Sequence, residues 1–83
     1  MVTVKYFASL RQIADKEEES FDLNGETTLA KLAEVIATTQ PTIGEMVRNK
    51  KVAISVNHDI VPLDTIVRDG DEIALLPPFS GGI

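Results

Sequence analysis

The residue types best suited to chemistry stand in the last stretch of the chain, residues 77–83, which reads PPFSGGI. Proline has no backbone donor and a fixed φ, so Pro77-Pro78 predicts the end of a strand and then a stiff, extended spacer. Gly81 and Gly82 lack a Cβ, so this part of the chain can enter a space too narrow for side chains. Chain ends are often frayed. The order of apolar strand, diproline, aromatic residue and diglycine nevertheless favours a terminus that itself carries the chemistry.

The single histidine and the acidic residues do not form a pattern of metal ligands. His58 stands beside Asp59 in an expected turn, with no third ligand near it in the sequence, whereas zinc sites use three or four protein ligands. The acidic residues around Gly70 lack the spacing of a calcium-binding loop. They are interpreted as turn formers: Asp69, Asp71 and Glu72. The sequence therefore predicts no metal site.

No activated nucleophile and no phosphate-binding loop can be recognised either. Ser80 has no base near it in the sequence, and a serine nucleophile needs one. Gly81-Gly82 is followed by neither a lysine nor a helix, so it does not match a phosphate loop. The absence of cysteine removes a cysteine nucleophile and cysteine metal ligands. The favoured class is a substrate or carrier for enzymes, and whether the chain acts as an enzyme subunit stays open at this point.

Length, charge and hydropathy narrow the class further. A chain of 83 residues makes one domain. Its net charge of -5 argues against nucleic-acid binding, which needs a basic face. No apolar run reaches membrane-spanning length, and the first residues do not have the layout of a signal peptide. Because a small domain without disulfides fits the cytosol better than secretion, we expect a cytoplasmic protein without a membrane partner.

Two strands and a short helical turn are expected before the main helix. Alternating apolar residues predict a strand over residues 2–7. Residues 8–14 predict a short helical turn with Arg11 on its polar side, and residues 16–23 predict a second, charged strand. The glutamates at residues 17–19 are interpreted as a solvated edge that discourages further strand pairing.

The middle of the chain predicts one long amphipathic helix. Thr27 or Thr28 is the expected N-cap, and Pro41 is the expected stop. Between them, apolar residues recur at helical spacing: Leu29, Leu32, Ala33, Ile36 and Ala37. Residues 42–47 suggest one further helical turn.

Three more strands are expected in the last third. Residues 52–57 alternate as a strand, residues 60–61 start a short strand that Pro62 confines to an edge, and residues 72–76 form the last strand. In the connector between them, Leu63 and Ile66 are expected to point inward.

This order of elements predicts an α+β fold of the β-grasp (ubiquitin-like) type. A single long helix can cover one face of one mixed sheet, and the preference for right-handed crossovers then favours a roll. In this roll the first and last strands lie side by side and parallel at the centre. We expect residues 1–76 to form the β-grasp domain and residues 77–83 to form a projecting diglycine tail.

The parity of the two central strands predicts an apolar patch beside the tail. If Val4 and Tyr6 face the helix, Phe7 faces the other way. In the last strand, Leu76 likewise faces away from the helix if Ile73 and Leu75 face it. Phe7 and Leu76 stand at the ends of parallel neighbours, and Ile60 is a third candidate. Clustered apolar residues on an uncovered face indicate a protein-binding surface.

Four segments carry a resemblance to a known family. The chain resembles the small, sulfur-carrier subunits of molybdopterin synthase from end to end, with a variable middle. The matching segments are VKYFASLR at 4–11, VN at 56–57, DGDEIA at 69–74 and PPFSGG at 77–82. The diproline and diglycine ending on a β-grasp body is the most specific of them.

The resemblance implies a role for the chain terminus. In that family, an activating enzyme related to those of ubiquitin adenylates the terminal glycine carboxylate with ATP, and the adenylate becomes a thiocarboxylate. The tail then enters the large synthase subunit, where its sulfur passes to a pterin precursor of the molybdenum cofactor. No cofactor is bound stably, because the activating partner consumes the ATP.

Carried onto this sequence, the resemblance assigns residues to two roles. Gly82 would be the activated residue and Gly81 its slender neighbour. The partner interface would hold Phe7, Arg11, Ile60, Leu76 and Phe79.

Ile83 departs from the family pattern, in which the chain ends at the second glycine. Three alternatives follow: Ile83 is trimmed, this member works differently, or the chain is not a sulfur donor. We expect that Ile83 must be removed before the chain can carry sulfur. Two other functions share the diglycine: a ubiquitin-like protein modifier, and the related sulfur carrier of thiamine biosynthesis. The Arg11 helical turn and the diproline favour the pterin branch over the thiamine branch.

Overall fold

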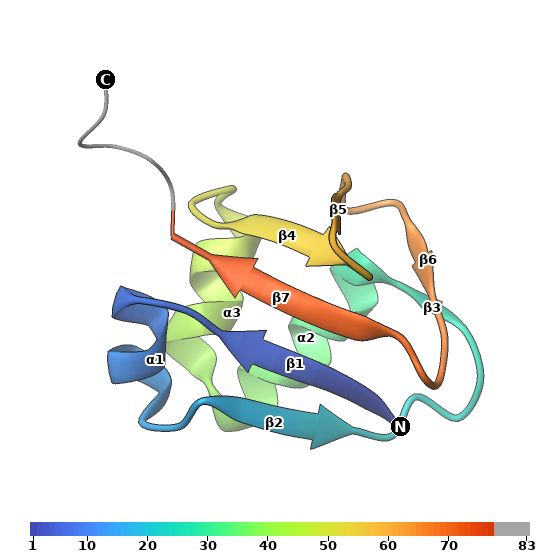
Figure 1. The fold of residues 1–83 in the computed structure, drawn as a ribbon, viewed down its shortest axis with the longest axis horizontal. Helices are drawn as coiled ribbons and strands as arrows, with labels where there is room; N and C mark the ends of the chain where they lie inside the picture. The colour runs from blue at the N-terminus through green and yellow to red at the C-terminus, as the bar shows by residue number, and fades with distance from the viewer. Residues whose placement is uncertain (78–83) are drawn as a thin grey trace.

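The computed structural model describes residues 1–77. Five strands form one mixed sheet in the order β2-β1-β7-β4-β5, with helices behind it (Figure 1). The strands of this sheet are β1 (Val2–Tyr6), β2 (Glu18–Phe21), β4 (Ala53–Val56), β5 (Asp59–Ile60) and β7 (Glu72–Leu76). A second, two-stranded sheet pairs β3 (Thr27–Thr28) with β6 (Ile66–Val67). The β-grasp prediction is confirmed.

The two central strands are parallel, as predicted. Thr3 pairs with Glu72 and Tyr6 with Leu75, so the first and last strands of the chain run side by side. Their inward side chains are fully buried against the helices: Val2, Val4, Tyr6, Ile73 and Leu75. The opposite side of the sheet, which we call the open face, is turned toward the viewer in Figure 1.

Helix α2 (Leu29–Thr39) is the main helix over the sheet. It begins at Thr28, whose side chain accepts a hydrogen bond of 3.2 Å from the Lys31 amide, which satisfies one of the free donors of the first turn. Its apolar stripe is buried through Leu29, Leu32, Ala33 and Ile36. The predicted helix and its cap are therefore confirmed.

Two shorter helices flank α2. Helix α1 (Ser9–Ala14) follows β1 directly. Helix α3 (Pro41–Arg48) is longer than the single turn expected, and it begins with the proline that ends α2. Proline is well suited to the first position of a helix, where its missing N–H would have no partner anyway. Within the described residues, no helix is long and apolar enough to cross a membrane.

The close contact of α2 and α3 depends on Gly44. A Cβ added to this residue would meet the Ala37 Cβ and lie 2.9 Å from the Ala37 Cα. No real side chain tolerates such a distance to backbone, so one of the helices would have to move. Glycine is therefore required here for space rather than for an unusual φ.

The structure corrects one expected core residue. Ile66 was expected to point inward but is 49% exposed, whereas Val67 beside it is fully buried. The reason is that these two residues form a strand with β3, and successive side chains of a strand point to opposite faces.

One polar contact lies at the edge of the core. The Tyr6 hydroxyl donates a hydrogen bond of 3.0 Å to the Glu19 carboxylate, and Lys16 approaches the same carboxylate at 3.7 Å. Glu19 belonged to the stretch interpreted as a solvated edge, yet it is half-buried. Burial raises the pKa of Tyr6, and the hydrogen bond and charge of Glu19 raise it further.

We expect Gly44→Ala to lower the free energy of unfolding by about 1–3 kcal/mol, as overpacked cores do. Urea denaturation followed by circular dichroism measures this. Thr42→Ala is the matched control, because Thr42 is exposed on the same helix and should change stability little. A Gly44→Ala chain as stable as its parent would contradict the tight packing, since alanine otherwise favours helices.

We expect stability to fall as pH rises above about 10, the pKa of an unperturbed tyrosine. The unfolded chain loses its tyrosine proton there while the folded chain keeps it, so the stabilising contribution is complete below that pH and decreases above it. Tyr6→Phe should remove this component. At neutral pH it should cost about 0.5–1.5 kcal/mol for the lost hydrogen bond.

The measurement is direct because Tyr6 is the only tyrosine and the chain has no tryptophan. Ultraviolet absorbance of the tyrosinate, recorded beside urea denaturation across the alkaline range, reports its ionisation in the folded protein. Ionisation at the ordinary pKa in folded protein would contradict the prediction.

Candidate partner-binding site

The ends of β1 and β7 bring two predicted site residues together. The Phe7 amide donates to the Leu75 carbonyl at 3.2 Å, so the parallel ladder continues one residue past β1. Because Tyr6 pairs with Leu75, the next residues, Phe7 and Leu76, are neighbours on the open face. Phe7 is 36% exposed and Leu76 is half-buried.

Two rows of side chains cross the open face at this end. The first row continues from Leu76 to its β4 partner Ala53. The second row contains Lys5, Ala74, Ser55 and Ile60, joined by successive strand pairings. Ile60 is 67% exposed. We call Phe7, Ala53, Ile60, Ala74 and Leu76 the apolar patch.

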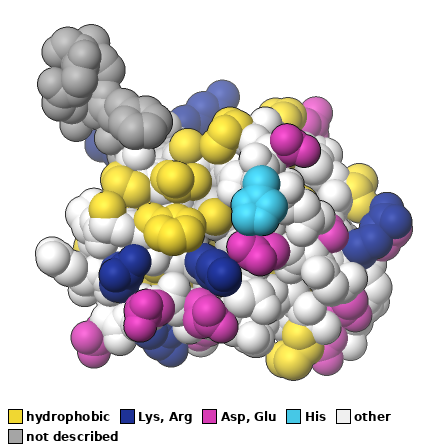
Figure 2. Space-filling model, in the orientation of Figure 1, with side chains coloured by type: hydrophobic (Ala, Val, Ile, Leu, Met, Phe, Trp, Pro, Cys, Tyr) yellow, Lys and Arg dark blue, Asp and Glu magenta, His cyan; other side chains and the backbone are white. Residues whose placement is uncertain are grey.

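Charged side chains border the patch toward the middle of the sheet. The Lys5 ammonium lies 3.4 Å from the Glu72 carboxylate, on strands that cross the middle of the sheet. Figure 2 shows apolar side chains gathered between these charged groups and the end of the sheet where β7 finishes. Since β7 is followed by Pro77 and then by the residues predicted to form the tail, the patch lies beside the point where the predicted tail begins, which we call the base of the tail.

The remaining predicted site residues divide into two groups. Arg11 is exposed on α1, which lies beside the end of β1 (Figure 1). Phe79, Gly81, Gly82 and Ile83 lie outside the described residues. The roles given to all of these residues stay predictions.

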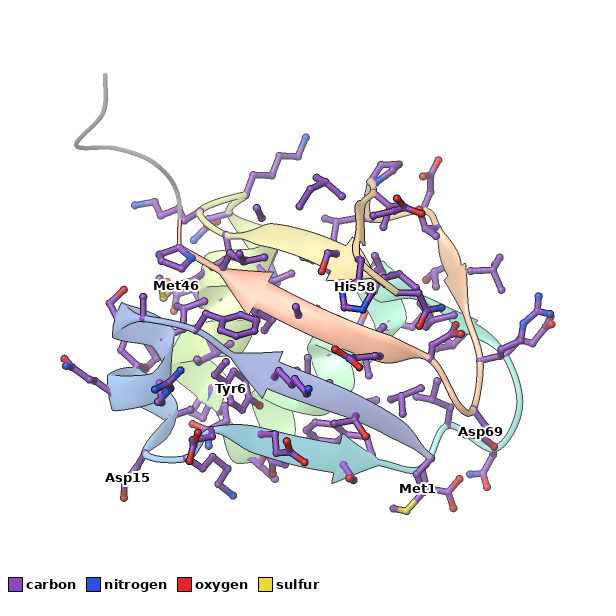
Figure 3. All side chains as sticks on the ribbon, in the orientation of Figure 1. Met1, Tyr6, Asp15, Met46, His58 and Asp69 are labelled. Atoms are coloured by element: carbon purple, nitrogen blue, oxygen red, sulfur yellow. The ribbon has the colours of Figure 1, made fainter. Side chains whose placement is uncertain are left out.

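The histidine and the acidic residues belong to turns. His58 is exposed, with a φ of 78°, and it lies at the far end of β4 from the base of the tail (Figure 3). Asp71 accepts hydrogen bonds of 3.0 Å from the Asn57 side chain and the Arg68 amide. Among residues 1–77, no three side chains of the ligating types are grouped to hold a metal ion.

The edge of the sheet beside the patch was not anticipated from the sequence. A groove runs along the outer side of β4, and Ala53 and Ile60 of the patch also line it. Its other walls come from α3 and from the connector after β5. No local pattern signals a groove built from three separate segments.

Comparison with known proteins finds a family model and curated relatives that match nearly the whole chain. A model of the ThiS family matches residues 4–82. The chain is 37% identical to a molybdopterin synthase sulfur carrier subunit from Chlamydomonas reinhardtii, over 98% of each sequence.

Solved structures agree with the fold. Small archaeal modifier protein 1 (SAMP1) from Haloferax volcanii is 25% identical, covers 98% of each chain and gives a TM-score of 0.80. A chain in the complex of subunits 1 and 2 of molybdopterin-converting factor from Helicobacter pylori is 28% identical, with a TM-score of 0.65. That match covers 98% of this chain and 97% of the other.

The matches extend over almost the whole sequence, and they include both the strands that carry the apolar patch and the diglycine. The chain therefore belongs to the ThiS family, and molybdopterin synthase sulfur carrier subunits are among its full-length relatives.

Proposed function

We propose that this chain is the sulfur-carrier subunit of a molybdopterin synthase. The observation that carries the proposal is the apolar patch at the base of a diglycine tail, in a chain whose full-length relatives bear that name. The patch provides a surface for a protein partner, and the tail provides a group that the partner can act on.

The chemistry follows from the properties of a carboxylate. Hydrolysis of the Gly82–Ile83 peptide bond first leaves a carboxylate on Gly82. A carboxylate is a poor electrophile, so the activating enzyme then transfers AMP from ATP to it and releases pyrophosphate. A sulfur nucleophile at the oxidation level of hydrosulfide then displaces AMP and leaves a thiocarboxylate on Gly82. Inside the large subunit its sulfur forms a C–S bond to the pterin precursor as a leaving group departs from that carbon. Water then cleaves the acyl–sulfur bond, which leaves the sulfur on the pterin and returns the Gly82 carboxylate.

The folded body contributes binding and position rather than reacting groups. In this proposal the prolines at 77 and 78 supply a backbone with restricted φ, and Gly81 supplies a residue without a side chain next to the reacting group. Fixing the reacting group by a docked surface reduces the entropy that the transfer step must lose. Phe7, Ile60, Leu76 and Phe79 supply apolar contact in this proposal, and Arg11 supplies a cation at the border.

A second candidate is a ubiquitin-like protein modifier, which would join its diglycine to lysines of other proteins. The likeness to SAMP1 supports it. The sulfur carrier of thiamine biosynthesis is a third candidate, because the ThiS family model matches most of the chain. A blot of the native cell for larger conjugates separates the modifier from both carriers.

We expect Leu76→Glu to weaken binding to the large subunit at least tenfold, because it places a charge in the apolar patch that the partner would cover. Isothermal titration calorimetry measures the affinity, and thermal unfolding checks the fold. Ile66→Glu is the control, since Ile66 is an exposed aliphatic residue that lies on the second sheet, outside the patch. A fall of several degrees in the Tm of Leu76→Glu would mean that Leu76 is a core residue.

We expect chains ending at Gly82 and at Ile83 to differ sharply as substrates of the activating enzyme. One added residue moves the carboxylate by about 3.3–3.6 Å and places a branched side chain where glycine should pass. ATP–pyrophosphate exchange measures activation, and mass spectrometry of the native protein measures removal of isoleucine and replacement of oxygen by sulfur. Equal activation of both chains would contradict the blocking effect, and Ile83 in every native molecule would contradict the carrier role.

A further inference from the structure

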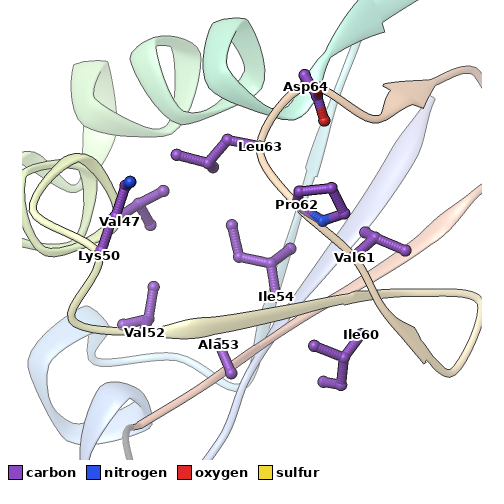
Figure 4. A pocket seen from close by; sticks show the side chains of 10 residues that line it. All are labelled: Val47, Lys50, Val52, Ala53, Ile54, Ile60, Val61, Pro62, Leu63 and Asp64. Carbon is purple, nitrogen blue, oxygen red and sulfur yellow. The ribbon is translucent and has the colours of Figure 1, made fainter.

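The groove beside β4 has apolar walls and an open strand edge. It holds about 450 Å³ and is lined mainly by aliphatic side chains, including Val47, Val52, Ile54, Val61 and Leu63. In Figure 4, β4 runs along the groove, with α3 at one end and the connector after β5 at the other. Aliphatic walls along a strand suit an extended apolar peptide.

The edge of β4 is only partly covered by its neighbour. β5 pairs with Ser55 and Val56, and the Val61 amide donates to the Ile54 carbonyl at 3.1 Å. The chain then reaches Pro62, which has no N–H, and it is held away from β4 by a hydrogen bond from the Ala30 amide to the Leu63 carbonyl.

The edge extends beyond β5 at Val52. This residue stands in a bend just before β4 and lines the groove, whereas β5 pairs only with Ser55 and Val56. The backbone groups of Val52 are therefore not covered by β5. An added strand could pair with them, as in recognition by strand addition.

One end of the groove is cationic. Lys50 lines it, and Arg48 and Lys51 are exposed next to it in the sequence. Three of the eight lysine and arginine residues of a chain with net charge -5 thus stand within four positions. Asp64 lines the groove as well, apart from Lys50 at the opposite side of the opening (Figure 4). This charge arrangement favours a bound peptide segment that carries a carboxylate at the end of the groove where Lys50 lies.

We propose that the groove binds an extended apolar segment of the large synthase subunit, with an acidic residue placed against Lys50. The inference rests on the proposed function. The large subunit is the occupant because the groove is continuous with the apolar patch through Ala53 and Ile60, so a protein that covers the patch reaches the groove. Patch and groove then form one interface that extends around the edge of the sheet.

The test compares Lys50→Glu with Lys31→Glu in calorimetric titration of the large subunit. Both lysines are exposed and both changes alter the net charge equally, but Lys31 lies on α2, away from the groove lining. Lys50→Glu should weaken binding about tenfold, and Lys31→Glu should change it less than twofold. Hydrogen exchange should slow at the Val52 amide in the complex, because an added strand would bond it.

The outcomes separate this inference from the proposed function. If Leu76→Glu weakens large-subunit binding and Lys50→Glu does not, the groove assignment is wrong and the carrier role stands. If Lys50→Glu impairs only activation, measured by pyrophosphate exchange, the large subunit is the wrong occupant. Unchanged exchange at the Val52 amide would overturn strand addition, and a wild-type chain that does not bind the large subunit would overturn the proposed function itself.

Discussion

The parallel pairing of β1 with β7 is the constraint on which the rest of the molecule depends. It joins Val4 to Ile73 and Tyr6 to Leu75, and the side chains of all four are buried in one core. Parallel neighbours end at the same edge of a sheet, so the pairing also sets Phe7 beside Leu76. The surface proposed to bind a partner is therefore a direct result of the register that stabilises the core.

That register explains why much of the fold could be predicted from the sequence. The alternation of Val2, Val4 and Tyr6 and the helical stripe after Thr28 are local patterns, and each matches its environment in the folded chain. The position of Phe7 and Leu76 followed from the same alternation once the two strands were placed side by side. Local pattern and overall topology agree here, which is typical of sequences that specify one structure.

The features that were not predicted from the sequence arise from contacts between segments that are far apart in the chain. Ile66 and Val67 are both apolar, and only pairing with β3 decides which is buried. Glu19 stands in a charged run, yet its carboxylate accepts a hydrogen bond from the hydroxyl of Tyr6 on the neighbouring strand β1. The groove beside β4 requires α3, β4 and the connector after β5 to meet. None of these outcomes is encoded in a spacing of neighbouring residues.

The pairing of the first strand with the last also governs when the domain can fold. Thr3 and Glu72 are partners, so nearly the whole chain must be closed into a loop before the central pair forms, and folding driven by such distant contacts is slow. During synthesis, β1 cannot pair until β7 has emerged from the ribosome. Most of the core stays incomplete until then. A truncated chain that lacks β7 therefore has no central strand pair and cannot present the apolar patch. Assembly of the binding surface is thus coupled to completion of the strand that leads into the tail.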